Sequence, residues 1–112
     1  MSLPHLNRKL VLEHAVRTPD QSGGYATVWS TLGALWAEIA PGTGAERGAN
    51  ALALSRVPLK ITVRAAPVGS DARPMAGQRF REGPRIYSIL AVAERDTQAR
   101  FLVCHAQEEV AA

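Results

Sequence analysis

The sequence predicts an all-β fold, a small closed or partly open β-barrel of about six strands. Short stretches with large apolar residues at every second position recur along the chain, as they do in half-buried strands. Turn formers separate these stretches at close intervals, and strand patterns do not alternate with helix patterns. Closing the sheet would also remove exposed strand edges, which a chain of 112 residues has difficulty covering.

Two strands are expected in the first part of the chain. Residues 8–17 alternate, and the positions that share one face are Leu10, Leu12, His14 and Val16. Residues 18–24 are dense in turn formers and lead to residues 25–29, which pair with the first strand as a hairpin. Residues 30–33 interrupt the second strand as a bulge. The strand resumes over residues 35–40, where Trp36 and Glu38 point away from the face that carries Leu35, Ala37 and Ile39.

The longest connection of the chain covers residues 41–56 and is rich in glycine and alanine. Residues 49–55 include good helix formers, so this loop has room for a short helix, which would be marginal without packing. Its small side chains offer too little apolar surface to hold one conformation alone. We therefore expect residues 1–112 to form a single domain, with residues 41–56 as a long projecting loop.

Four more strands complete the prediction, over residues 57–64, 78–81, 85–92 and 99–106. In the first of these, Leu59, Ile61 and Val63 face inward. The next two flank Glu82-Gly83-Pro84, which is a hairpin signal. The tail from Gln107 to Ala112 is expected to fray.

Composition and charge limit the function classes. The formal net charge is +3, but residues 42–100 carry ten basic and five acidic residues. That surplus suits nucleic acid, an acidic protein face or simply a solvated surface. No apolar run approaches the roughly 20 residues that span a bilayer, so a membrane role is not expected. The single cysteine, Cys104, excludes an internal disulfide framework and fits a reducing compartment.

We expect no catalytic, cofactor or metal site. Gly42, Gly44 and Gly48 follow a strand, but their spacing departs from a dinucleotide fingerprint and no βαβ unit surrounds them. Cys104 and His105 are neighbours in a strand and point to opposite faces, so they cannot easily share a metal ion. Cys104 also lies in an apolar stretch, where thiols are usually inert, so a small enzyme is the weakest of the hypotheses.

A nucleic-acid-binding barrel of OB type is the alternative function that the basic surplus suggests. A single-strand binder needs aromatic side chains for stacking, and Phe80 and Tyr87 are the only candidates near the basic residues. A contact surface for a protein partner explains the same charges equally well. The candidate polar interface residues are Lys60, Arg64, Arg79 and Arg81.

A series of short motifs runs from Leu6 to Glu108. In order, they are Leu6-Asn7-Arg8-Lys9-Leu10, Thr18-Pro19-Asp20, Gly23-Gly24-Tyr25, Trp29, Leu35-Trp36-Ala37-Glu38-Ile39 leading into Pro41, Gly44 and Glu46, Ile61-Thr62-Val63-Arg64, Gly77-Gln78-Arg79-Phe80, Tyr87-Ser88-Ile89 and Arg100-Phe101-Leu102-Val103-Cys104. Their order and spacing resemble those of the head–tail joining proteins, also called head-completion or stopper proteins, of long-tailed phages and phage-derived gene transfer agents. One departure is that residues 81–85 look inserted as a longer hairpin, which leaves the strand register there open.

The resemblance implies a barrel subunit that assembles into a homo-oligomeric ring of six or twelve copies. In such a virion or phage-like particle, assembled in the bacterial cytoplasm, the ring lies below the portal and adaptor rings and above the tail terminator and tail tube. It helps to retain the double-stranded DNA that passes through its channel, and it needs no catalysis and no cofactor. The residues expected in the channel or between rings are Gly42, Gly44, Glu46, Arg47, Gly48, Asn50 and Arg56.

Overall fold

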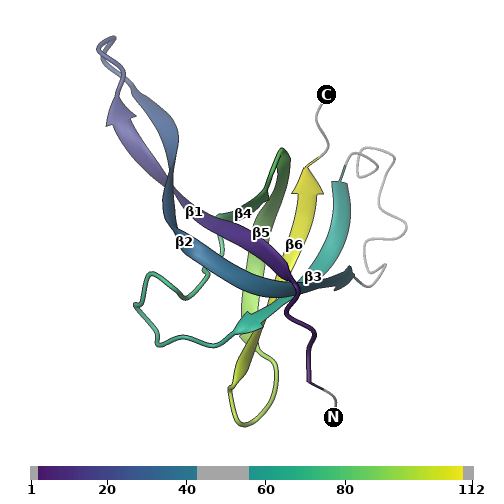
Figure 1. Cartoon of the computed structure of the whole chain (residues 1–112). Coiled ribbons are helices and arrows are strands. Elements are labelled where there is room, and N and C mark those ends of the chain that lie inside the picture. The colour runs from purple at the N-terminus through teal and green to yellow at the C-terminus, as the bar shows by residue number, and fades with distance from the viewer. Residues whose placement is uncertain (1–2, 43–55, 110–112) are drawn as a thin grey trace.

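Six antiparallel strands make up the computed structural model, which describes residues 3–42 and 56–109 (Figure 1). They are β1 (Arg8–Pro19), β2 (Tyr25–Pro41), β3 (Arg56–Arg64), β4 (Arg79–Glu82), β5 (Arg85–Glu94) and β6 (Phe101–Glu109). The strands pair in the order β1-β2-β3-β6-β5-β4 and close into a barrel. The predicted all-β barrel is therefore confirmed. The described residues form no helix, and the short helix suggested for residues 49–55 lies outside them.

The barrel consists of two three-stranded meanders, β1-β2-β3 and β4-β5-β6, in which neighbours in sequence are neighbours in the sheet. Two seams join the meanders. The long seam pairs β3 with β6 over nine residue pairs, from Arg56 opposite Glu109 to Arg64 opposite Phe101. The short seam pairs β1 with β4 over only three residue pairs, between residues 11–13 and residues 79–81. Closure of the barrel thus depends on a short contact between strands that lie far apart in sequence.

β1 and β2 continue beyond the barrel as a two-stranded ribbon, which we call the arm (residues 14–31; Figure 1). A bulge marks its root: Leu12 pairs with Gly33 and Glu13 with Thr31, so Leu32 is the extra residue. Bulges bend and twist the strand that carries them, which directs the arm away from the barrel. The interruption expected at residues 30–33 is therefore confirmed.

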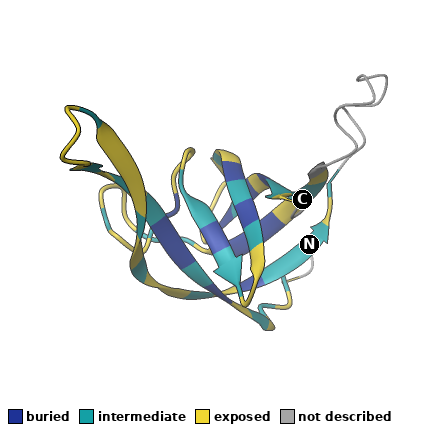
Figure 2. Cartoon of the chain, turned by 90° about the horizontal axis from the view of Figure 1, so that it is seen from above, coloured by how far each residue is buried: buried dark blue, intermediate teal, exposed yellow. Residues whose placement is uncertain are grey.

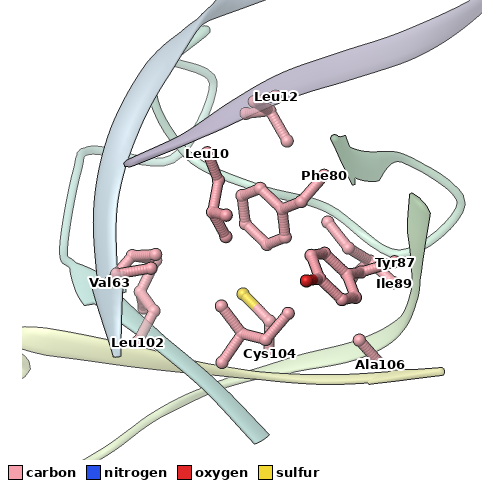
Figure 3. Close-up of a cluster of buried hydrophobic side chains, with 11 residues drawn as sticks. Leu10, Leu12, Val63, Phe80, Tyr87, Ile89, Leu102, Cys104 and Ala106 are labelled. Carbon is pink, nitrogen blue, oxygen red and sulfur yellow. The ribbon is translucent and has the colours of Figure 1, made fainter. Parts of the chain in front are cut away.

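Alternation fills the barrel interior with apolar side chains from every strand (Figure 3). The buried cluster comprises Leu10, Leu12, Ala37, Ile61, Val63, Phe80, Tyr87, Ile89, Leu102, Cys104 and Ala106. Residues predicted to face inward in the first three strands are buried or packed against this cluster, apart from His14 and Val16, which lie on the half-buried side of the arm. Period-two patterning thus identified the core positions of these strands within the barrel, but not where β1 leaves it.

Two details of the strand boundaries differ from the expectations. The tail does not fray directly after Ala106, because Gln107–Glu109 continue β6 and pair with both β3 and β5. The β4–β5 hairpin is tight rather than extended: Glu82 pairs with Arg85, so only Gly83 and Pro84 form the loop. Gly83 has a φ of 59°, the sign that a type II′ turn requires at its first central position. This settles the register that the sequence left open.

Candidate interaction surfaces

Only the two ends of the predicted channel loop belong to the described residues. At the near end, the Gly42 N–H donates to the carbonyl of Pro58 at 3.0 Å. A Cβ atom at Gly42 would lie 3.1 Å from the Leu59 nitrogen, which is backbone and cannot turn aside, so glycine suits this exit from β2. At the far end, Arg56 begins β3 opposite Glu109. The other predicted loop residues, Gly44, Glu46, Arg47, Gly48 and Asn50, lie outside the described residues.

The four residues predicted as a polar interface do not form one surface. Lys60 and Arg64 lie on β3, whereas Arg79 and Arg81 lie on β4, and three steps around the barrel separate these strands in either direction. Lys60 and Arg64 are exposed on the outside of their wall. Sequence patterning predicted that these cations point outward, but it held no information on which strands become neighbours.

Arg79 and Arg81 converge on Glu13, on the outside of the short seam. The Nε atom of Arg79 donates to Glu13 Oε1 at 2.7 Å, and the Nε atom of Arg81 donates to Oε2 at 2.8 Å. Glu13 is only 5% exposed. Burial raises the pKa of its carboxyl group, but the hydrogen bonds from Arg81 and Arg79 outweigh burial and leave the pKa below its ordinary value. The Arg79 guanidinium in turn lies over the Trp29 ring, 4.2 Å from its centroid.

A second charged network links β1, β4, β5 and β6 at one end of the barrel. Arg8 donates twice to Glu82, at 2.8 and 2.6 Å, and the Tyr87 hydroxyl donates to the same carboxylate at 2.8 Å. Arg85 donates twice to Glu108, at 2.7 and 2.9 Å. The bond from Arg8 lowers the pKa of Glu82 to about 2, and burial raises the pKa of Tyr87 to about 12. Paired forks of this kind fix strand ends in direction as well as in distance.

The Arg8–Glu82 pair makes stability depend on pH. The pKa of the Glu82 carboxyl is 4.5 when unperturbed and about 2 in the folded chain, so its stabilisation is complete above pH 4.5 and is lost as the pH falls towards 2. At pH 7, a Glu82→Gln variant is expected to be less stable than the wild type by about 2 kcal/mol. Urea unfolding at pH 7, 4 and 2.5 should show this difference shrinking as the solution becomes more acidic.

Glu94→Gln is the matched control for that series, because Glu94 is exposed at the end of β5 and accepts none of the hydrogen bonds described above. Its stability should follow that of the wild type at every pH within about 0.5 kcal/mol. A difference between wild type and Glu82→Gln that stayed constant from pH 7 to pH 2.5 would contradict the assigned role of the Arg8–Glu82 pair.

Residues considered for catalysis or stacking lie in the core. Burial raises the pKa of the Cys104 thiol to about 12, so at neutral pH it is protonated and a poor nucleophile. Within the described ranges, no three histidine, cysteine or acidic residues gather as metal ligands would. Phe80 and Tyr87, the two aromatic residues considered for stacking, are fully buried and cannot stack on bases.

Sequence reasoning did not single out the aromatic residues that the structure exposes. We call the outward side shared by β1, β2 and β4 the aromatic face, and it comprises Arg17, Tyr25, Trp29, Trp36, Arg79 and Arg81. Tyr25 is 62% exposed and Trp36 is 55% exposed. Figure 2 shows how much of the β1–β2 ribbon is open to solvent. The alternation in β2 did predict that Trp36 points away from the face that carries Leu35. It could not show that no other segment covers the outer face.

A shallow groove borders this face where the ribbon joins the barrel. Its lining residues are Leu6, Ala34, Leu35, Trp36 and Arg64. The guanidinium of Arg64 lies 5.7 Å from the centroid of the Phe101 ring, at the neighbouring end of β6. The groove therefore offers apolar walls with a cation at its edge.

Comparisons with known proteins agree with this architecture. Residues 1–109 match the family described as phage head completion protein. A chain in the structure of the virion of a native gene transfer agent particle is 54% identical, with a TM-score of 0.80, over 98% of this chain and 100% of that chain. Protein SF1141 from Shigella flexneri 2a is 20% identical, with a TM-score of 0.67 over 96% of each chain, which is a likeness of fold alone. No curated protein matches the chain. Among the described residues, none forms a helix long and apolar enough to cross a membrane.

Proposed function

Because the chain belongs to the phage head completion protein family, we propose that it is a structural head–tail connector subunit of a phage or phage-like particle. The observation that carries this proposal is the 54% identity, over 98% of this chain and 100% of that chain, with a chain of a gene transfer agent virion. In the proposed role, copies of the barrel form a ring below the portal and adaptor rings. The ring helps to retain packaged double-stranded DNA and docks the tail.

The barrel holds both ends of the connection between β2 and β3 in fixed positions. Arg56, where this connection ends, pairs with Glu109, and the preceding residue Glu108 is held by two hydrogen bonds from Arg85. At the other end, Gly42 is bonded to the backbone of Pro58. Both attachment points are therefore held by backbone pairing or charge-assisted bonds, which suits a segment that bears load in a ring.

In this proposal, the connection itself meets the channel or the neighbouring ring, with Glu46, Arg47 and Arg56 as its polar contacts. Small residues such as Gly44 and Gly48 allow several copies to approach a narrow axis. Many weak contacts between identical copies then add up to a stable ring, because each further contact is made within an assembly that already exists. The proposed role is structural and involves no catalysis.

Deleting residues 44–54 tests the assignment of the connection. Particles that carry the shortened chain are expected to lose packaged DNA or to fail in tail joining, because the segment that narrows the channel is missing. The measurements are the DNA content of purified particles and the fraction with tails by electron microscopy. A Gly/Ser linker of equal length is the control, since it preserves the reach of the connection and removes its side chains.

The two parts of the proposal fail in different ways. Normal DNA content and normal tails in particles with the deletion would contradict the assignment of this connection to the channel. The connector role of the protein would not be affected. Absence of the wild-type protein from purified particles, measured by quantitative mass spectrometry, would overturn the connector role itself.

A further inference from the structure

We propose that the aromatic face binds an acidic, extended segment of a different protein of the particle, an inference that rests on the proposed function. The face runs from the barrel wall onto the arm, and both tryptophans of the chain lie on it. Across β1, Lys9 pairs directly with Trp36 and adds another exposed cation. Aromatic residues and arginine are the side chains enriched at the centres of protein interfaces.

Stacking holds Arg17 ready for binding, and it also orients Arg79, whose Nε atom already donates to Glu13. The Arg17 guanidinium lies 4.7 Å from the centroid of the Tyr25 ring, and that of Arg79 lies 4.2 Å from the centroid of the Trp29 ring. A guanidinium that is stacked on a ring keeps its in-plane N–H groups available and loses little further freedom when it binds a carboxylate. The face thus combines apolar area with Arg17 as a preorganised donor of hydrogen bonds to anions.

The arm also offers unpaired backbone. In the described residues, β1 pairs with β4 only as far as Glu13, and β2 pairs with β3 only from Ala37 onward. Outside those limits each strand has one open edge along the arm. A two-stranded ribbon is marginal in water by itself, and an open edge is completed by an extended peptide segment. This feature favours a protein partner over nucleic acid, which cannot continue a β-sheet.

The carboxylates of the partner should come from a different protein rather than from a second copy of this chain. Nine of the ten acidic residues are described, and seven of these accept hydrogen bonds within the chain. The two exceptions are Asp71 and Glu94, which belong to a loop and to the end of β5. Among the described residues, these two carboxylates alone accept no hydrogen bond within the chain, so few carboxylates of a second copy are free to pair with the aromatic face.

Site-specific crosslinking in intact particles tests this proposal. Tyr25, Trp36 and Lys60 of the full-length chain are replaced, one at a time, by the photoreactive residue p-benzoylphenylalanine. Lys60 is the control because it is exposed on β3, on another wall of the barrel. Irradiation is expected to join positions 25 and 36 to a different particle protein, within a peptide rich in aspartate and glutamate, and position 60 should not yield that product.

Charge reversal provides an independent measurement. Arg17→Glu and Lys60→Glu change the net charge equally, and both residues are exposed on strands. Arg17→Glu is expected to reduce the yield of the crosslink from position 36 by about tenfold. The change removes a cationic hydrogen-bond donor and adds a carboxylate that repels the carboxylates of the partner. Lys60→Glu should leave that yield within about twofold of wild type.

Each other outcome counts against the proposal. Adducts at positions 25 and 36 that contain only a second copy of this chain, or only DNA, would overturn it, as would equal losses with Arg17→Glu and Lys60→Glu. Particles that contain the protein but give no adduct at either position would also overturn it, and the connector role would survive. If the wild-type protein were absent from the particles, the connector role and this inference would both fail.

Discussion

Replacing Glu13 with glutamine is expected to lower the free energy of unfolding by about 3 kcal/mol. The carboxylate is buried and accepts hydrogen bonds from both Arg79 and Arg81 across the short seam. A neutral amide cannot balance two guanidinium groups, and its NH2 group would face donors instead of acceptors. Urea denaturation at neutral pH measures the loss, which should appear as a lower midpoint with an unchanged slope.

A double-mutant cycle separates this pairing from other effects of the substitution. Glu13→Gln is combined with Arg81→Gln, and the two changes should be less damaging together than the sum of the single effects by about 1 kcal/mol or more. Glu94→Gln serves as the exposed control and should change stability by less than about 0.5 kcal/mol. Strict additivity in the cycle would show that Glu13 does not stabilise the seam through Arg81.

Replacing Phe80 with alanine should have the largest effect on stability, a loss of about 3–5 kcal/mol. Phe80 is the only buried residue of the four in β4, and it pairs with Leu12 on one side and Tyr87 on the other. Its ring therefore anchors β4 in the barrel, and truncation leaves both a cavity and a strand with little else to hold it. Thermal and urea unfolding of the purified chain measure the effect.

Phe80→Leu tests whether volume at this position is the cause. Leucine keeps much of the apolar volume, so the loss should fall to about 1–2 kcal/mol. If the alanine variant proves too unstable to purify, the leucine variant still carries the test. Equal stability of wild type and both variants would mean that β4 is held by the backbone and the ion pairs alone.

The sequence predicted the barrel strands well because large apolar residues recur at every second position along most of them. Leu59, Ile61 and Val63 illustrate this: their spacing requires that they share a face, and that face lines the core, although Thr62 on the other face is also buried. The same logic sent Trp36 outward. The alternation within a strand depends on that strand alone, so the inward and outward residues can be predicted without knowledge of the tertiary structure.

Other expectations failed or stayed open where the answer depends on which strands meet. Lys60 and Arg79 were both predicted as possible interface residues; barrel closure places them on opposite walls, and their part in an interface stays a prediction. Gln107–Glu109 were expected to fray, but they have two partner strands, β3 and β5. Periodicity could not show that β1 and β2 extend beyond their pairing with β4 and β3 and so form the arm. The role predicted for the loop residues between Gly42 and Arg56, in the channel or between rings, remains a prediction.

The two seams of unequal length give the barrel a preferred order of opening. Parting β1 from β4 breaks three residue pairs, whereas parting β3 from β6 breaks nine. Amide protons along the short seam should therefore exchange with solvent through a local, low-energy opening, while those along the long seam await global unfolding. We therefore expect the barrel to open first between β1 and β4, while β3 and β6 stay paired. The hydrogen bonds from Arg79 and Arg81 to Glu13 oppose this opening.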